Sequence, residues 1–314
     1  MIVLWLCAGV AAFLLAALAG LAWAGSSRMM ARRAPDAQTS PADYGLAYED
    51  ISFPSRDGIA LRGWFIPSDP ARATVIFCHG HAGSMDPDLI YAPWFHEAGF
   101  NVLMFDFRAH GRSAGRNVSL GYFERRDLLG AIDYLRGQGI TEVGVLGFSM
   151  GGAVGIVTAP QSEAIRAVVS DGGFARLESA MLGWAQEQRM DLPRWLVLPL
   201  ARLVVTVAGW RLGVRLPEAD PLRWVGRIAP RPILFVHGDR DPYVTVTDME
   251  SLYAAAGEPK ELWRVPEAGH RQVDQCRPAE YRERVVGFFK RHLGDGEKRE
   301  TSNVKRAGGS SDDI

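Results

Sequence analysis

The residues best placed for covalent chemistry lie in the stretch VGVLGFSMGGAVG, in which closely spaced glycines surround Ser149. An apolar run enters this stretch and a small-residue helical pattern leaves it, which predicts a turn between a strand and a helix. Such a turn holds its central residue in a strained conformation above the edge of a sheet, and the flanking residues must be small. Gly147 and Gly151 supply that space. Ser149 is therefore the candidate nucleophile, and the alternative is a structural serine in a glycine-rich turn.

A serine hydroxyl is a poor nucleophile near neutral pH, so this turn predicts a general base and a carboxylate that orients the base. Both residue types follow, in the order acid and then histidine. Asp241, in the segment HGDRDPYV, is the candidate acid, and Asp239 competes with it. His270, at the end of VPEAGH, is the candidate base. Each follows a predicted strand, and parallel strands end at one edge of a sheet, so we expect Ser149, Asp241 and His270 to meet there.

Attack on a carbonyl also requires N–H donors that stabilise the oxyanion. The N–H of Met150 is one candidate, because Met150 follows the nucleophile and opens the predicted helix. The N–H of His81, in the loop HGHAGS, is the second candidate. His79, His81 and His110 lack the spacing of a metal-ligand set, so we expect loop hydrogen bonds from them, and no metal ion or cofactor.

The elements that must position these residues are short apolar runs that alternate with helical stretches. Two strands, at 46–55 and 60–67, are predicted to form a hairpin around an Asp-Gly turn. Further strands are predicted at 73–80, 101–108, 142–149, 165–173, 232–239 and within 260–270. Helices are predicted at 87–98, 120–136, 151–159, 247–256 and 277–293. Continuous apolar strands separated by helices indicate a mostly parallel, twisted sheet with helices on both faces.

One stretch, residues 175–227, contains no clear strand and is predicted to be a helical lid insertion. Its central part, 192–210, is apolar enough to suggest a second membrane span, but it contains prolines and arginines that are costly in lipid: Pro193, Arg194, Pro199 and Arg202. Two alternatives stay open for this part. Either it packs wholly as core, or one face lines an acyl-binding cleft and touches the bilayer.

The N-terminal residues 1–24 carry no charged side chain and are long enough to cross a bilayer as a helix. Trp5 and Trp23 lie near the two ends, and Arg28, Arg32 and Arg33 follow. We predict an uncleaved single-pass anchor with the catalytic domain in the cytoplasm, because basic residues favour that side. The alternative is a cleaved signal peptide, since the sequence AWA resembles a cleavage site. A signal peptide, however, has a basic start and a shorter apolar run.

Composition sets the remaining limits. The chain has 314 residues, 47% of them hydrophobic, and a formal net charge of −1. The length and the hydrophobic content are sufficient for one large domain. The balanced charge gives no indication of nucleic-acid binding. The three cysteines, Cys7, Cys78 and Cys276, favour neither a disulfide scaffold nor a thiolate metal site, and we expect buried or half-buried thiols. The predicted organisation is an anchor at 1–25, a linker at 26–43, a catalytic domain at 44–293 and a disordered tail at 294–314.

This ordered set of motifs resembles the α/β-hydrolase superfamily, over residues 59–293. The resemblance is carried by the pentapeptide around Ser149, the His79-Gly80 strand end, the segment DFRAHGRSAG, the acid loop and the Gly269-His270 pair. Within the superfamily, the chain looks similar to membrane-anchored, small-lid hydrolases of the Bem46-type and serine-aminopeptidase-like groups. The resemblance implies the α/β-hydrolase fold.

The resemblance also bears on single residues. It places the acid at Asp241, which leaves Asp239 to bond the backbone of its own turn. Where the family pattern has Arg-Gly-x-Gly, this chain has Ala109 after Arg108, so one glycine is lost. Arg108 and Asp106 are expected to form structural ion pairs beneath the rim of the site.

The sequence therefore predicts a membrane-anchored serine hydrolase that cleaves an ester or thioester through an acyl-enzyme. Ser149 attacks the carbonyl, His270 transfers the proton, Asp241 fixes the imidazole, and the N–H groups of Met150 and His81 hold the oxyanion. The expected partner is a small-molecule acyl substrate, with lipid-like molecules among the candidates. The alternatives are a peptidase that acts on short peptides and a non-catalytic scaffold used for binding.

Overall fold

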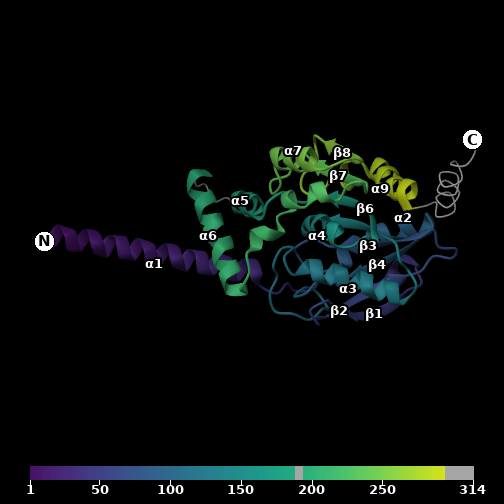
Figure 1. The fold of residues 1–314 in the computed structure, drawn as a ribbon, viewed down its shortest axis with the longest axis horizontal. Helices are drawn as coiled ribbons and strands as arrows, with labels where there is room; N and C mark the ends of the chain where they lie inside the picture. The colour runs from purple at the N-terminus through teal and green to yellow at the C-terminus, as the bar shows by residue number, and fades with distance from the viewer. Residues whose placement is uncertain (188–193, 294–314) are drawn as a thin grey trace, which may run out of the picture.

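Eight strands form one sheet in the order β1-β2-β4-β3-β5-β6-β7-β8, in a computed structural model that describes residues 1–187 and 194–293 (Figure 1). β2 pairs antiparallel with β1 and with β4, and all other neighbours are parallel. The strands are β1 (Glu49–Pro54), β2 (Ala60–Ile66), β3 (Ala73–Cys78), β4 (Phe100–Phe105), β5 (Val143–Phe148), β6 (Ile165–Asp171), β7 (Ile233–Gly238) and β8 (Lys260–Val265). The strand order reverses between β3 and β5, which is where open α/β sheets bind ligands.

Helices cover both faces of this sheet, as predicted. One face carries α3 (Glu124–Gly137), α4 (Met150–Thr158) and α7 (Val246–Ala255), whose apolar side chains belong to one buried cluster. The other face carries α2 (Ala92–Glu97) and α9 (Pro278–Leu293), which contribute to a second cluster. Short helices occur at η1 (Pro41–Tyr44), η3 (Ala159–Gln161) and α8 (Val273–Cys276). The fold class predicted from the sequence is confirmed.

Two predicted helices differ from those observed. The helix predicted at 87–98 starts as a 3₁₀ helix, η2 (Asp86–Tyr91), and only then becomes α2. Pro87 and Pro93 each lack an N–H, so α-helical hydrogen bonds cannot run continuously through this stretch. The helix predicted from residue 120 begins instead at Glu124. Leu120 and Gly121 have positive φ angles of 53° and 115°, which are incompatible with a right-handed helix.

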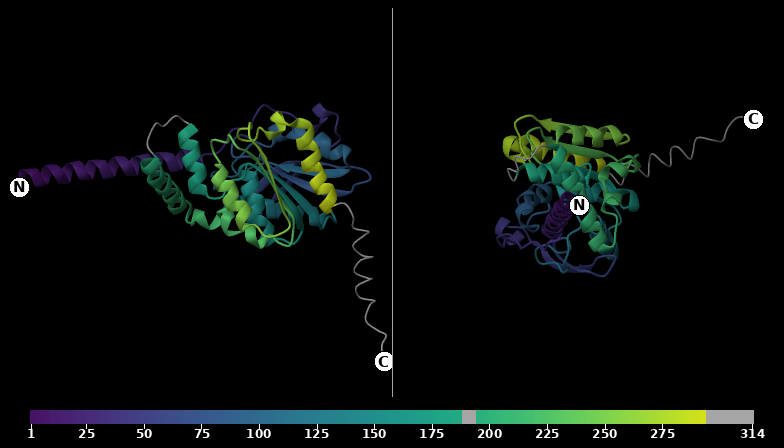
Figure 2. Two further views of the ribbon diagram at one scale, coloured as in Figure 1. Left: turned by 90° about the horizontal axis from the view of Figure 1, so that it is seen from above. Right: turned by 90° about the vertical axis from the view of Figure 1, so that its left-hand side faces the viewer.

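The described residues of the insertion between β6 and β7 form helices joined by short turns, without a strand. It contains α5 (Leu177–Glu187), α6 (Arg194–Leu212), η4 (Leu216–Ala219), η5 (Pro221–Arg223) and η6 (Val225–Arg227). Residues 188–193 of the predicted lid lie outside the described part of the chain. Figures 1 and 2 place α5 and α6 at the end of the domain from which the N-terminal helix projects.

The N-terminal helix α1 (Ile2–Met30) projects away from the domain over its first half (Figures 1 and 2). Among the described residues it is the one helix long and apolar enough to cross a membrane. The helix ends five residues beyond the predicted anchor, because Ser26, Met29 and Met30 are buried where α1 packs against the domain.

The predicted linker is held on the domain surface. The N–H of Arg33 donates to the carbonyl of Ala109 at 2.8 Å, and the N–H of Thr39 donates to Asp86 at 3.0 Å. These contacts fix the chain between α1 and β1 to loops near the carboxyl edge of the sheet. The predicted tail at 294–314 lies outside the described residues.

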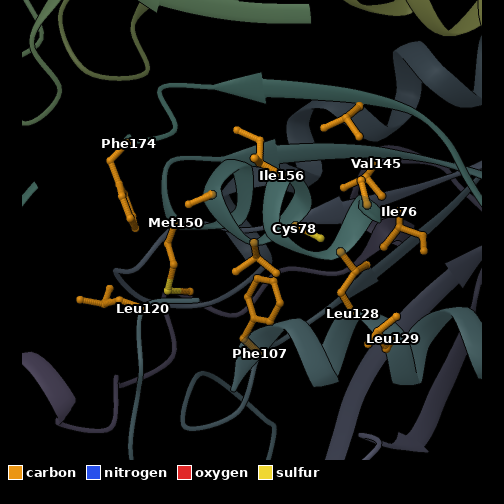
Figure 3. Close-up of a cluster of buried hydrophobic side chains, with 14 of the residues drawn as sticks. Ile76, Cys78, Phe107, Leu120, Leu128, Leu129, Val145, Met150, Ile156 and Phe174 are labelled. Carbon is orange, nitrogen blue, oxygen red and sulfur yellow. The ribbon is translucent and has the colours of Figure 1, made fainter. Parts of the chain in front are cut away.

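A buried apolar cluster supports the start of α4 from below. Figure 3 shows the Met150 side chain lying between Phe174 and Leu120, to the left of Phe107 in this view. Cys78 is buried in the same cluster, and burial raises the pKa of its thiol. Cys276 is half-buried, whereas Cys7 is exposed on α1, so the expectation of a shielded thiol is wrong at that position.

Candidate active site

Ser149 lies at the apex of the turn between β5 and α4. Its φ of 51° and ψ of −112° form a strained combination for a residue with a side chain. A Cβ at Gly147 would collide with the backbone of Gly151, and a Cβ at Gly151 would collide with the carbonyl of Cys78. The two glycines therefore allow the strand, the turn and β3 to approach one another, as the spacing in the sequence predicts.

The structure brings Ser149, His270 and Asp241 into one hydrogen-bonded chain. Nε2 of His270 lies 2.9 Å from Oγ of Ser149, and Nδ1 of His270 lies 2.6 Å from Oδ2 of Asp241. Asp241 follows β7 and His270 follows β8, so the parallel strands deliver both side chains to the edge where β5 ends. The Asp241 side chain is almost fully buried, with 1% of its surface exposed.

The second carboxylate oxygen of Asp241 is fixed by the backbone. Oδ1 accepts hydrogen bonds from the N–H of Tyr243 at 2.7 Å and of Val244 at 2.9 Å. This orientation leaves Oδ2 for the imidazole of His270. The ring of Tyr243 packs edge-on against that imidazole, with 4.9 Å between the ring centres.

Asp239 is directed away from this chain of hydrogen bonds. Its carboxylate binds the guanidinium of Arg264 at 2.8 and 3.0 Å, and this hydrogen bonding lowers the pKa of Asp239. The expectation that its side chain bonds the backbone of its own turn is wrong, because the long side chain of Arg264 on the neighbouring strand β8 reaches the carboxylate. Asp239 is therefore not available to His270.

The two candidate oxyanion donors lie on either side of Ser149. Met150 is the first residue of α4, and the first N–H groups of a helix have no partner within the helix. The loop that carries His81 passes close to the nucleophile, since a Cβ on Gly80 would lie 3.6 Å from Cβ of Ser149. Within the described ranges, the N–H groups of Met150 and His81 have no hydrogen-bond acceptor.

Histidines fix the loop around His81. Nε2 of His79 accepts from the N–H of Phe107 at 2.9 Å, and Nε2 of His110 lies 3.0 Å from the carbonyl of His81. Burial lowers the pKa of both His79 and His110. These are the loop hydrogen bonds expected from the sequence. The part of the chain that the structure describes contains no cluster of three potential metal ligands.

Arg33 is a site residue that sequence reasoning missed. Its guanidinium lies 2.7 Å from Nε2 of His81 and also donates to the carbonyl of Arg28 at 2.9 Å. Burial and the nearby Arg33 lower the pKa of His81 to about 3, so the neutral imidazole accepts from the guanidinium. The segment after α1 is thus bonded to the candidate oxyanion loop. The sequence signal was only a basic cluster, which is typical of any membrane flank.

Arg271, also missed, holds the loop that carries His270. Its guanidinium forms an ion pair with the buried Asp88 and lies 4.4 Å above the ring of Phe148. Arg271 itself has a positive φ of 53°. Asp88 lies 183 residues away in the sequence, so no local pattern indicates this pair.

The segment after β4 contains the ion pairs that the sequence predicts. Arg108 forms ion pairs with Asp127 at 2.7 Å and Asp57 at 2.5 Å, as predicted. Asp106 also forms an ion pair, with Arg112 at 3.8 Å, and its carboxylate accepts the backbone N–H groups of Met85 and Arg112. Ala109, which replaces the family glycine, adopts a φ of 57° at a cost of about 1 kcal/mol.

A cleft of about 730 Å³ opens above Ser149 and His270. This volume lies in the range of small-molecule sites. Apolar side chains line most of it, including four from α6: Val197, Leu200, Ala201 and Val204. The opposite side of α6 exposes Trp195 and Trp210, at 72% and 74%. Of the two alternatives for 192–210, the described residues therefore favour a helix with one exposed face over a wholly buried one.

Comparisons with known proteins agree with this fold. The sequence model of the family described as alpha/beta hydrolase fold matches residues 73–208. The protein YfhR of Escherichia coli K12 is 30% identical over 252 residues, which cover 77% of this chain and 80% of YfhR. The protein bem46 of Schizosaccharomyces pombe is 26% identical over 259 residues, which cover 80% and 79%. The esterase Pf2001 of Pyrococcus furiosus superposes with a TM-score of 0.71 at 28% identity, covering 84% of this chain and 99% of the esterase.

Proposed function

The chain belongs to the α/β-hydrolase superfamily, in which it fits the Bem46-like group, and from this premise we propose that it is a serine hydrolase that cleaves carboxylic esters or thioesters. The observation that carries the proposal is the pair of hydrogen bonds, 2.9 Å and 2.6 Å, that links Ser149 through His270 to Asp241. An unrelated structural role for this serine would not require the strained turn or the aligned imidazole.

In the proposed mechanism, Oγ of Ser149 attacks the carbonyl carbon while Nε2 of His270 takes the hydroxyl proton. Asp241 keeps the proton of the neutral imidazole on Nδ1 and stabilises the imidazolium that forms. The N–H groups of Met150 and His81 stabilise the oxyanion. His270 then protonates the leaving alcohol or thiol, and the acyl group stays on Ser149. Water, activated by His270, releases the acid in the second half of the reaction.

The lining of the cleft supports an acyl substrate over a peptide with a free amine. An aminopeptidase needs negative charge that binds the substrate ammonium group. Among the described residues that line the cleft, none is Asp or Glu, whereas Arg28, Arg33 and Arg271 lie there. The esterase name of the 28% identical Pf2001 agrees with this choice.

A substrate panel tests the reaction class. We expect the purified protein to hydrolyse p-nitrophenyl esters of graded chain length, and acyl-thioesters, with kcat/KM well above that for aminoacyl p-nitroanilides. The reverse ranking would identify a peptidase. A fluorophosphonate probe tests the scaffold alternative in the same preparation, because an idle scaffold takes up no label.

We also propose that α1 is an uncleaved membrane anchor, with Arg28, Arg32 and Arg33 holding the catalytic domain on the cytoplasmic side. Support comes from the exposure of its apolar residues up to Leu21. Packing at its other end also argues against cleavage near residue 25. A Cβ at Gly25 would lie 2.8 Å from Val204 in α6, so cleavage there would cut a helix where it packs on the lid.

The expected result is that the full-length protein stays in the membrane pellet after a carbonate wash, because a spanning helix is released only when detergent dissolves the bilayer. Mass spectrometry of the pelleted protein should find the N-terminus near Met1. A mature N-terminus near Gly25 would instead identify a cleaved signal and an extracytoplasmic domain. Protease access to the catalytic domain in intact cells then decides the orientation.

A further inference from the structure

One side of α1 lines the active-site cleft. Leu21, Ala24, Gly25 and Arg28 all border the same cleft as Ser149. Their spacing of three, four and seven residues places them on one face of the helix, over about 10 Å of its length. The membrane helix is therefore part of the cavity in which the proposed chemistry takes place.

The neighbouring side of α1 is held against the lid helix α6. The guanidinium of Arg211 donates to Oγ of Ser26 at 2.7 Å and to Oγ of Ser27 at 2.8 Å, and it lies 4.1 Å above the ring of Trp23. The ring of Trp23 also meets that of Trp210 edge-on. These contacts give the wall formed by α1 a defined position relative to the lid.

The apolar wall continues from the cleft into the exposed half of α1. Leu21 is 59% exposed, and Leu18 and Leu14 precede it by one and two turns on the same side. In the proposed topology those turns lie in the hydrocarbon layer. An acyl chain can then pass along α1 from the bilayer toward Ser149 without crossing water. Such a path avoids the free-energy cost of exposing each methylene of the chain to water.

The inner end of this path carries two guanidinium groups. Arg28 and Arg33 line the cleft, and among the side chains that the structure describes neither forms an ion pair with Asp or Glu. Arg28 lies 5.2 Å from the ring of Trp184, and Arg33 binds backbone carbonyls and His81. Two guanidinium groups at the end of an apolar groove suit an amphiphile with a negative head group.

We propose that α1 forms one wall of the substrate cleft and that the substrate is a long-chain ester lipid of the bilayer with an anionic head group. This inference rests on the proposed serine hydrolase activity. The acyl chain lies between α1 and α6, and the head group lies near Arg28 and Arg33. Hydrolysis breaks the ester C–O bond, water supplies the hydroxyl of the fatty acid, and the head-group alcohol takes the remaining proton.

The role of α1 is tested with matched substitutions in the full-length protein in mixed micelles. Ala24→Phe adds a ring on the cleft face, and Ala19→Phe adds the same ring about 140° around the helix. Both positions are exposed. We expect Ala24→Phe to lower the ratio of kcat/KM for p-nitrophenyl palmitate to that for p-nitrophenyl acetate about tenfold or more. Ala19→Phe should leave the ratio unchanged, and equal ratios in the two variants would overturn the assignment of α1 as a wall.

The head group is tested with three lipids that share one palmitoyl chain: monopalmitoylglycerol, lysophosphatidylcholine and lysophosphatidylglycerol. The wild type should prefer the anionic lysophosphatidylglycerol, and Arg28→Gln should lower its kcat/KM relative to monopalmitoylglycerol about tenfold. Arg32→Gln removes the same charge at a position outside the cleft, and it should keep the wild-type preference. Free glycerol 3-phosphate should inhibit weakly, since it lacks the acyl chain. Equal rates on all three lipids would exclude an anionic substrate.

Fluorophosphonate labelling separates this inference from the activity on which it depends. A wild-type protein that takes up no label and hydrolyses no p-nitrophenyl ester would refute the serine hydrolase itself. The opposite outcome would leave the hydrolase intact and refute the lipid path. In that outcome, labelling and p-nitrophenyl acetate hydrolysis are normal, Ala24→Phe keeps the wild-type preference for palmitate, and Arg28→Gln keeps the wild-type head-group preference.

Discussion

Replacing Ser149 by alanine should lower kcat by about six orders of magnitude, the loss seen when a triad nucleophile is removed from a serine hydrolase. The physical reason is that, in the proposed mechanism, Oγ of Ser149 attacks the substrate carbonyl, and a methyl group cannot form the acyl-enzyme. The fold should stay intact, because alanine fills the same strained position between Gly147 and Gly151 with a smaller side chain. Turnover of a p-nitrophenyl ester and the melting temperature are the two measurements.

A second variant sharpens this test. If the residues act as one unit, the variant that combines Ser149→Ala with His270→Ala should lose no more kcat than Ser149→Ala alone. Each single change already removes the function of the hydrogen-bonded group as a whole. Multiplicative losses in the double variant would mean that His270 acts elsewhere. Residual activity close to wild type in Ser149→Ala, or fluorophosphonate label on another serine, would assign the nucleophile to a different residue.

Asp241→Asn should lower kcat about 10⁴-fold with little change in structure. The backbone N–H groups of Tyr243 and Val244 donate to Oδ1 of Asp241. In the variant, the amide oxygen of the introduced asparagine therefore takes the place of Oδ1, because the amide NH₂ group cannot accept these hydrogen bonds. The amide NH₂ group then faces His270 and donates to Nδ1. This places the imidazole proton on Nε2, where the ring can no longer accept the proton of Ser149.

Asp239→Asn is the matched control, with the same chemical change two residues away. Asp239 pairs with Arg264 at a partly exposed position, so this variant should lose less than about twofold in kcat. The pH dependence and turnover of both variants are measured on one short-chain ester. A larger loss in Asp239→Asn than in Asp241→Asn would reverse the assignment of the acid.

Local sequence determined the parts of the site that depend on backbone chemistry and chain order. The glycines on either side of Ser149 predict the strained turn, because steric contacts between adjacent residues act at short range. The continuous apolar runs separated by helical stretches predict the parallel strands, and parallel strands deliver Asp241 and His270 to the edge where Ser149 lies. The fold class follows for the same reason, since an apolar strand must be covered on both faces.

Tertiary structure alone decided the long-range contacts that follow neither from a motif nor from the order of the strands. The contact of Arg33 with His81 and the ion pair of Arg271 with Asp88 join residues 48 and 183 positions apart, and no periodic pattern encodes such pairs. The same holds for α1. Its sequence indicates an apolar helix, whereas its place in the cleft depends on how Gly25 packs against Val204 on the lid. A hydrophobic pattern in the sequence predicts that a surface is buried. It does not predict which element covers that surface, because this depends on how the shapes of distant elements fit together when they pack.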